Sequence, residues 1–99
     1  MNSYRVRLTP EASRLIAKLP PEIKKLIRSA IDDLREDPYK GSELFGELAG
    51  YRSLKARRYR VIYRFDDHQA FVEIYHAGHR RDVYETLRLL LGASFKEEA

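Results

Sequence analysis

The chain contains no cysteine and no long apolar run. Without cysteine it forms no disulfides or thiolate metal sites, and thiol chemistry is excluded. Its longest uninterrupted apolar run is the three leucines at 89–91, whereas a helix needs about 18 apolar residues to span a bilayer. Residues 1–9 are polar and basic, unlike a signal peptide. These absences predict a cytoplasmic protein with no membrane partner.

Motifs for metal, nucleotide and nucleophilic chemistry are also missing. His76 and His79 form an H-x-x-H pair without a third ligand, and the few acids of the same region do not converge. Glycines 41, 46 and 50 fit no phosphate-binding loop. Ser53 has no histidine close to it in sequence, so no nucleophilic triad is visible. We therefore expect neither a metal nor a cofactor.

What the chain does contain is the pattern of one α+β domain, which we assign to residues 1–99. Its 99 residues suffice for a single hydrophobic core. Residues 4–8 alternate apolar and basic side chains, which is typical of a half-buried strand. At the other end, the tail at 93–99 is expected to fray.

A helical hairpin is predicted after the first strand. Thr9, Pro10 and Glu11 supply a capping hydroxyl, a proline for the first helical position and an acid for the first turn. A second helix should start at Pro21 and stop before Pro38, and its apolar residues recur every three or four positions. A tight proline turn joins the two helices.

Three strands and a helix are predicted in the second half. Residues 39–50 are expected to form a loop with an apolar contact at Leu44, Phe45 and Leu48. Strand signals follow at about 51–56, 59–66 and 70–76, and such short connections join only antiparallel neighbours. The segment DVYETLRLLLG predicts a short final helix. The expected fold is an antiparallel sheet with an N-terminal strand, a helical hairpin on one face and a short C-terminal helix (β-α-α-β-β-β-α).

The middle strand alternates in a way that separates charge from the core. One face carries apolar and aromatic side chains and would cover the helices, while the other carries arginines and would stay open. The two sets are Tyr59, Val61, Tyr63 and Phe65 against Arg60, Ile62 and Arg64.

Positive charge is concentrated in residues 51–81. This segment holds eight Lys/Arg against three acids, a net +5, whereas the whole chain carries only +4. A localised basic face is expected for a polyanion partner, although a solvated sheet edge would carry the same pattern. The arginine guanidinium can bind a phosphate through two hydrogen bonds, and a tyrosine ring can stack on an unpaired base. The composition therefore favours single-stranded nucleic acid as the partner.

Metal-free cleavage of RNA is compatible with these residue types. A ribose 2′-hydroxyl can attack the adjacent phosphorus if the protein aligns it and stabilises the added charge. Arginine can supply charge but is a poor proton donor. Tyr84 follows Arg80 by four residues and is a candidate for the proton transfer, as is His79; alternatively, the Tyr84 ring fills the core.

The segments YRVIYRF and FVEIYHAGHRRDVYE, separated by a D-D turn, resemble the RelE/ParE superfamily of toxins. The resemblance extends to the opening strand, the hairpin with its LP break, and LAGYRSLKARRYRVIY. It implies a small α+β toxin of a type II toxin–antitoxin system. RelE-like members cut mRNA in the ribosomal A site without metal, whereas ParE-like members inhibit DNA gyrase.

The RelE-like pattern is favoured because three positions match it. The resemblance implies that Arg60, Arg80 and Tyr84 are catalytic: the arginines stabilise the phosphorane and Tyr84 orients the 2′-hydroxyl or acts as base. RelE-like toxins also place basic residues on the preceding strand, where Ser53 and Tyr51 stand in the register of the lysines. Further basic residues are expected to bind phosphate or ribosomal RNA or to set the general field, namely Arg52, Lys55, Arg57, Arg58, Arg64 and Arg81.

The implied partners follow from the same resemblance. They are mRNA and the 70S ribosome A site, a cognate RelB-like antitoxin, and operator DNA reached through the toxin–antitoxin complex. The implied reaction is endoribonucleolytic and leaves a 2′,3′-cyclic phosphate, which makes the protein an mRNA interferase. Two alternatives stay open: a ParE-like toxin whose partner is DNA gyrase, and an attenuated toxin that acts mainly as a corepressor with its antitoxin.

Overall fold

The computed structural model describes residues 3–86 and confirms the α+β fold. The helices are α1 (Pro10–Ala17) and α2 (Pro21–Glu36), with short 3-10 segments η1 (Pro38–Lys40) and η2 (Gly46–Leu48). The strands are β1 (Arg5–Leu8), β2 (Ser42–Glu43), β3 (Arg52–Ala56), β4 (Tyr59–Asp66) and β5 (Phe71–His79). Residues 83–86 are helical and begin the predicted final helix, whose remainder lies with the 93–99 tail outside the described residues. No helix within 3–86 is long and apolar enough to cross a membrane.

The five strands form one sheet in the order β1-β5-β4-β3-β2. β3, β4 and β5 pair antiparallel, as expected from their short connections. β1, however, lies parallel to β5, with Arg5 opposite Phe71 and Leu8 opposite Ile74. The chain leaves β1 through both helices, and a connection of that length lets the strand enter the sheet in the parallel sense. The sheet is therefore mixed rather than wholly antiparallel.

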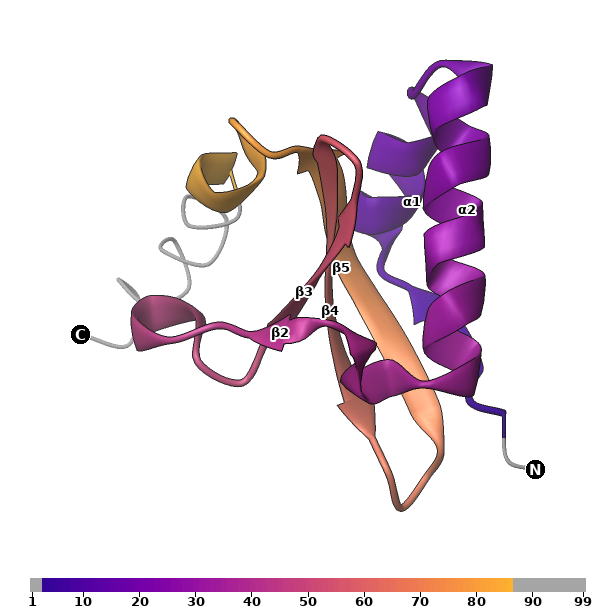
Figure 1. The fold of residues 1–99 in the computed structure, drawn as a ribbon, viewed down its shortest axis with the longest axis vertical. Coiled ribbons are helices and arrows are strands. Elements are labelled where there is room, and N and C mark those ends of the chain that lie inside the picture. Colours follow the sequence, from indigo (N-terminus) through magenta and orange to yellow (C-terminus); the bar gives the residue numbers. More distant parts are fainter. Residues whose placement is uncertain (1–2, 87–99) are drawn as a thin grey trace.

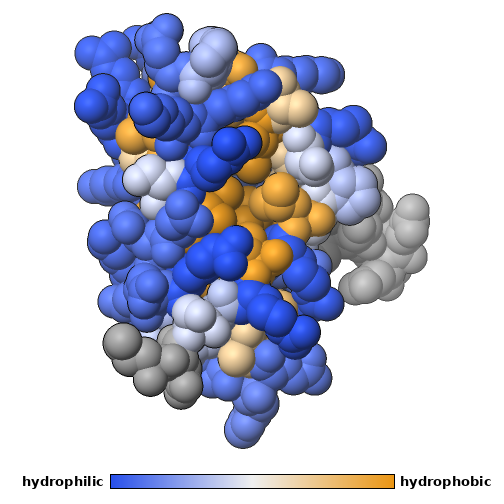
Figure 2. Space-filling model, turned by 90° about the vertical axis from the view of Figure 1, so that its right-hand side faces the viewer, coloured by the Kyte–Doolittle hydropathy of each residue, from blue (hydrophilic) through white to orange (hydrophobic). Residues whose placement is uncertain are grey.

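The helical hairpin covers one face of the sheet (Figure 1). Thr9 caps α1 as predicted, because its side-chain oxygen accepts a hydrogen bond from the Ala12 amide at 3.1 Å. The main core lies between the helices and the sheet, and includes Val61 and Tyr63 of β4, both fully buried. From the helix side, an apolar strip is visible between hydrophilic side chains (Figure 2).

A second, smaller apolar cluster lies on the opposite face, which we call the open face. It is centred on Leu48, Ile62 and Val83, and the ring of Tyr84 packs against it. Ile62 therefore points away from its neighbours Val61 and Tyr63, which confirms the predicted alternation of β4. The expected apolar contact at Phe45 is wrong, because this side chain is 79% exposed.

Candidate active site

The β3–β4 hairpin sets two pairs of side chains side by side on the open face. Its register puts Ser53 opposite Ile62 and Lys55 opposite Arg60. Residues two apart on a strand share a face, so Ser53 and Lys55 lie on the same side as Ile62 and Arg60. Two cations thus occupy neighbouring strands on the face that α1 and α2 do not cover.

Ser53, Lys55 and Arg60 line a pocket of about 340 Å³ on this face. Its wall combines three basic residues, three residues with hydroxyl groups, two leucines and a glycine, namely Lys40, Gly41, Ser42, Leu44, Ser53, Leu54, Lys55, Arg60 and Tyr84. Lys55 and Arg60 give this concavity a positive charge that can attract an anion, while the Lys40 ammonium is paired with Asp33. The hydroxyls provide neutral groups that can exchange or orient a proton.

Arg60 is held by the turn that precedes it. Its Nη1 donates to the carbonyls of Arg57 at 3.2 Å and Tyr59 at 3.0 Å. Both Nη1 hydrogens are used in these two bonds, so Nε and Nη2 are the groups that can donate to an anion in the pocket. The side chain is half-buried, which strengthens its interaction with an anion relative to a fully solvated charge.

Tyr84 joins the pocket from the helical turn at 83–86. Its hydroxyl lies 2.9 Å from Ser53 Oγ, and either oxygen can be the donor. Its half-buried ring packs against the cluster of Leu48, Ile62 and Val83. The ring therefore fills a small core, as one sequence interpretation expected, and the hydroxyl also reaches the pocket; the part of Tyr84 in proton transfer stays a prediction.

Arg80 lies close to this site by backbone but does not line the pocket. Gly78 pairs with Arg60, and the Arg80 amide donates to the Arg58 carbonyl at 2.7 Å. The Arg80 side chain is exposed at the turn after β5. The structure thus brings Arg60, Lys55 and Tyr84 together, with Arg80 at the margin.

His79 does not face the pocket, in contrast to the sequence expectation. A register shift between Ile62 and Tyr63 puts an extra residue into β5, and this turns Ala77 and His79 toward the helix side. The His79 ring contacts Tyr59 edge to face at 5.5 Å, and its Nδ1 accepts from the Arg81 amide at 3.2 Å. This geometry does not support proton transfer to a ligand on the open face.

Arg52 has a structural role, whereas the sequence predicted that it binds phosphate or ribosomal RNA. Its Nη2 donates to the carbonyls of Gly41 at 2.6 Å and Tyr39 at 3.1 Å, and Nη1 lies 3.4 Å from Glu43. The side chain is only 15% exposed. Arg52 therefore holds the segment that carries Lys40 instead of offering its guanidinium to phosphate.

The other basic residues lie around the site without entering it. Arg57 and Arg58 form the β3–β4 turn and line a different pocket beside α2. Arg64 is exposed on the open face, over the ring of Tyr51 at 5.2 Å, and Arg81 is exposed in the turn after β5. These four can contribute only to the general field of the pocket.

Sequence reasoning missed two residues of the pocket. Lys40 was treated as part of a loop, and its Nζ lies 3.1 Å from Asp33 at the end of α2. The sequence placed Ser53 in the register of the family's lysines and gave it no role as a nucleophile, and its contact with Tyr84 was not predicted. This contact joins segments distant in sequence, which local patterns do not encode. Among residues 3–86 no three His, Cys, Asp or Glu side chains are grouped so as to hold a metal ion.

Comparison with known proteins identifies the family. Residues 6–84 match the model of the ParE toxin of the type II toxin–antitoxin system parDE. The chain belongs to the RelE/ParE superfamily of toxins. It is 41% identical over 83 residues to Toxin RelG of Mycobacterium tuberculosis, which covers 82% of this chain and 95% of the relative. Toxin RelE of the same organism is 32% identical over 83 residues, or 82% of this chain and 86% of the relative.

Solved structures of RelE/ParE toxins share the fold. The toxin–antitoxin complex RelBE2 from Mycobacterium tuberculosis contains a chain with a TM-score of 0.75 and 38% identity, covering 80% of this chain and 93% of that one. The intact Escherichia coli RelBE complex matches with a TM-score of 0.69 at 20% identity, covering 78% and 96%, which shows the fold alone. The curated relatives make this protein a type II toxin of the RelE family.

Proposed function

We propose that this toxin is an mRNA endonuclease that cleaves mRNA in the A site of the 70S ribosome. The pocket on the open face, in which Lys55, Arg60 and Tyr84 meet, is the observation that carries the proposal. A phosphodiester in it would contact cations from two strands and a phenol at once. Such a site can stabilise the added charge on phosphorus without a bound metal.

The reaction that this arrangement supports is attack within the RNA itself. The 2′-oxygen forms a bond to the adjacent phosphorus while the bond to the 5′-oxygen breaks, which leaves a 2′,3′-cyclic phosphate and a 5′-hydroxyl. Tyr84 orients the 2′-hydroxyl or accepts its proton, and the Lys55 ammonium or water supplies a proton to the departing oxygen. Arg60 binds the phosphoryl oxygens, and Arg80 at the margin adds positive charge.

We also propose a RelB-like antitoxin as the partner of this toxin, and operator DNA as an indirect partner through that complex. The structures named above are toxin–antitoxin complexes, which supports this assignment. The pocket of about 620 Å³ between α2 and the β3–β4 turn is lined by apolar side chains and by charged ones, among which Lys25, Arg57 and Arg58 outnumber Glu22. An amphipathic antitoxin helix with acidic residues would match both.

Arg60→Ala tests the nuclease. We expect it to lower the rate of mRNA cleavage on programmed ribosomes by about 10²–10³-fold, as for loss of a charge-stabilising donor. Primer extension after brief induction should then lose the cuts within translated frames that the wild type produces. Arg28→Ala, which removes an exposed arginine on α2, is the matched control.

Intact transcripts with the wild-type toxin would contradict the proposal. The ParE family match makes gyrase the alternative target. In that case the wild-type protein would trap gyrase–DNA complexes, and purified ribosomes would show no cleavage.

A further inference from the structure

Ser53 is an unusual residue for its place in the sheet. It sits within β3 between Arg52 and Leu54, opposite Ile62 of β4, and it is only 7% exposed. A buried hydroxyl costs free energy unless it is hydrogen-bonded. Here the partner is the Tyr84 hydroxyl at 2.9 Å, thirty-one positions away in the sequence. The serine therefore ties the centre of the sheet to the C-terminal segment.

This contact fixes the reactive end of Tyr84. The tyrosine stands on a helical turn that follows the exposed residues 80–82, whereas Ser53 belongs to a strand paired on both sides. Packing against the cluster of Leu48, Ile62 and Val83 holds the ring and, with it, the oxygen at its tip. The hydrogen bond to Ser53 sets the direction of the hydroxyl hydrogen and restrains the remaining motion of that oxygen. Ser53 also lines the pocket beside Lys55, so the bonded oxygen is placed at the edge of that pocket.

A serine hydroxyl suits a partner that gains and loses a proton. It carries one donor hydrogen, which rotates, and two acceptor lone pairs. It can accept from a neutral phenol and donate to an ionised one without a change in its own charge. The same contact can therefore persist throughout a proton transfer at Tyr84.

We propose that Ser53 is a positioning residue that holds the Tyr84 hydroxyl for proton transfer. This inference rests on the proposed nuclease function, within which it assigns a role to a residue that exchanges no proton with the RNA itself. Ser53 acts through Tyr84, and the rate of the chemical step depends on it while toxin affinity for the ribosome does not.

Single-turnover cleavage on programmed ribosomes, measured across toxin concentration, tests the assignment. Ser53→Ala should lower the rate at saturating toxin by about 10- to 100-fold, as expected for a misplaced reacting group. The toxin concentration that gives half of the maximal rate should stay unchanged. Ser53→Thr keeps the hydroxyl on a side chain that suits a strand, and it should recover most of the lost rate.

A double-mutant cycle separates positioning from general damage. In the Tyr84→Phe background, Ser53→Ala should produce no further loss, because the hydroxyl it positions is already absent. Thermal melting establishes that each variant is folded, and Ser13→Ala removes an exposed serine of α1 as the matched control.

The outcomes distinguish two failures. If the wild type cleaves and Ser53→Ala cleaves equally fast, or loses only affinity, the role of Ser53 is overturned and the nuclease stands. An additive loss in the Tyr84→Phe background overturns it as well. If the wild type does not cleave at all, the proposed function fails and the role of Ser53 fails with it.

Discussion

Tyr63 shows how one side chain links the core to the candidate site. Its ring is fully buried beneath the helices, and its hydroxyl donates to the Pro38 carbonyl at 2.6 Å and accepts from the Gly41 amide at 3.0 Å. The segment fixed in this way carries Lys40 to the pocket. Gly41 leaves room for the contact, since a Cβ there would lie 2.6 Å from the Tyr63 oxygen and 2.8 Å from the Ser53 carbonyl oxygen.

Tyr63→Phe is expected to lower the free energy of unfolding by about 2 kcal/mol, because two buried backbone groups lose their partner. Urea denaturation followed by circular dichroism measures the change. Tyr39→Phe is the control, since it also removes a tyrosine hydroxyl, but from a side chain that is 58% exposed and bonded to Asp67 at the surface. Equal stabilities for Tyr63→Phe and the wild type would contradict the role given to this hydroxyl.

At the scale of elements, the helices and strands with a regular apolar pattern could be predicted from the sequence. The short strand β2 and the bulge in β5 could not. The helices and the strands β3 to β5 follow from apolar spacing, caps and short turns. β2 has two residues and exists only because β3 accepts it as a neighbour. The bulge in β5 is likewise set by pairing with β4, and it alone decides that His79 turns away from the open face.

The same limit applies to the candidate site. Arg60 and Tyr84 could be predicted, because strand alternation and the family pattern place them. The sequence around Arg52 is equally basic, yet its guanidinium reaches back to the carbonyls of Tyr39 and Gly41. Whether an arginine faces solvent or braces a loop depends on contacts between segments distant in sequence, which local patterns do not encode.

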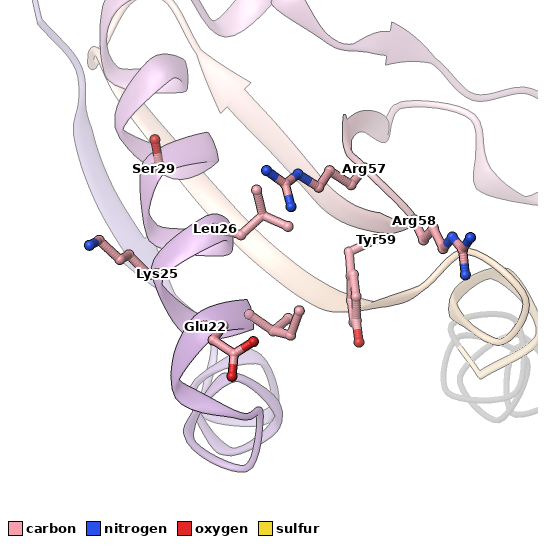
Figure 3. Close-up of a pocket in the computed structure, with 8 residues that line it drawn as sticks. Glu22, Lys25, Leu26, Ser29, Arg57, Arg58 and Tyr59 are labelled. Atoms are coloured by element: carbon pink, nitrogen blue, oxygen red, sulfur yellow. The ribbon is translucent and has the colours of Figure 1, made fainter.

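The groove between α2 and the β3–β4 turn is formed by two elements and is the proposed binding surface for the antitoxin. Figure 3 shows Leu26 of α2 and Tyr59 of β4 lining it, with the Arg57 guanidinium extending toward α2. Arg57 adopts a positive φ of 57° in this turn, which directs the chain sharply back into β4. Apolar side chains and an excess of cations are the features that an acidic amphipathic helix recognises.

Leu26→Ala should therefore weaken antitoxin binding by about 2 kcal/mol, or roughly 30-fold, through the apolar contact it removes. Titration calorimetry of the purified toxin with its antitoxin measures the affinity, and a melting curve of the free toxin reports any loss of fold. Leu8→Ala is the matched control, because Leu8 is 43% exposed and lies outside the groove. Undiminished affinity with Leu26→Ala would place the antitoxin elsewhere.

At the scale of the whole molecule, the sheet separates two surfaces. The helix side carries the groove and the open face carries the pocket of Lys55, Arg60 and Tyr84, so a partner on one side need not occupy the other. The β3–β4 turn is common to both, since Arg57 lines the groove while its carbonyl holds Arg60. Tyr59 has the same double position, because it lines the groove and its carbonyl accepts a hydrogen bond from Arg60.

The acid sensitivity of the whole fold should depend on His76. Its imidazole is only 3% exposed, and neither ring nitrogen has a hydrogen-bond partner among the described residues. Burial lowers the pKa of His76 below its ordinary value of 6.5, and Glu11 opposes this shift only in part. The unfolded chain therefore binds a proton that the folded chain does not as the pH falls below 6.5 toward the folded-state pKa, so the free energy of unfolding should decrease through this window.

Replacement of His76 by an apolar ring should remove this contribution. We expect His76→Phe to flatten the dependence of unfolding free energy on pH just below 6.5, the ordinary pKa, because the group that gains a proton on unfolding is gone. Urea titrations at closely spaced pH values measure the slope. His68→Gln, which removes an exposed imidazole from the β4–β5 turn, should retain the wild-type slope. If His76→Phe keeps that slope as well, the acid sensitivity arises from other groups, and the buried imidazole has no part in it.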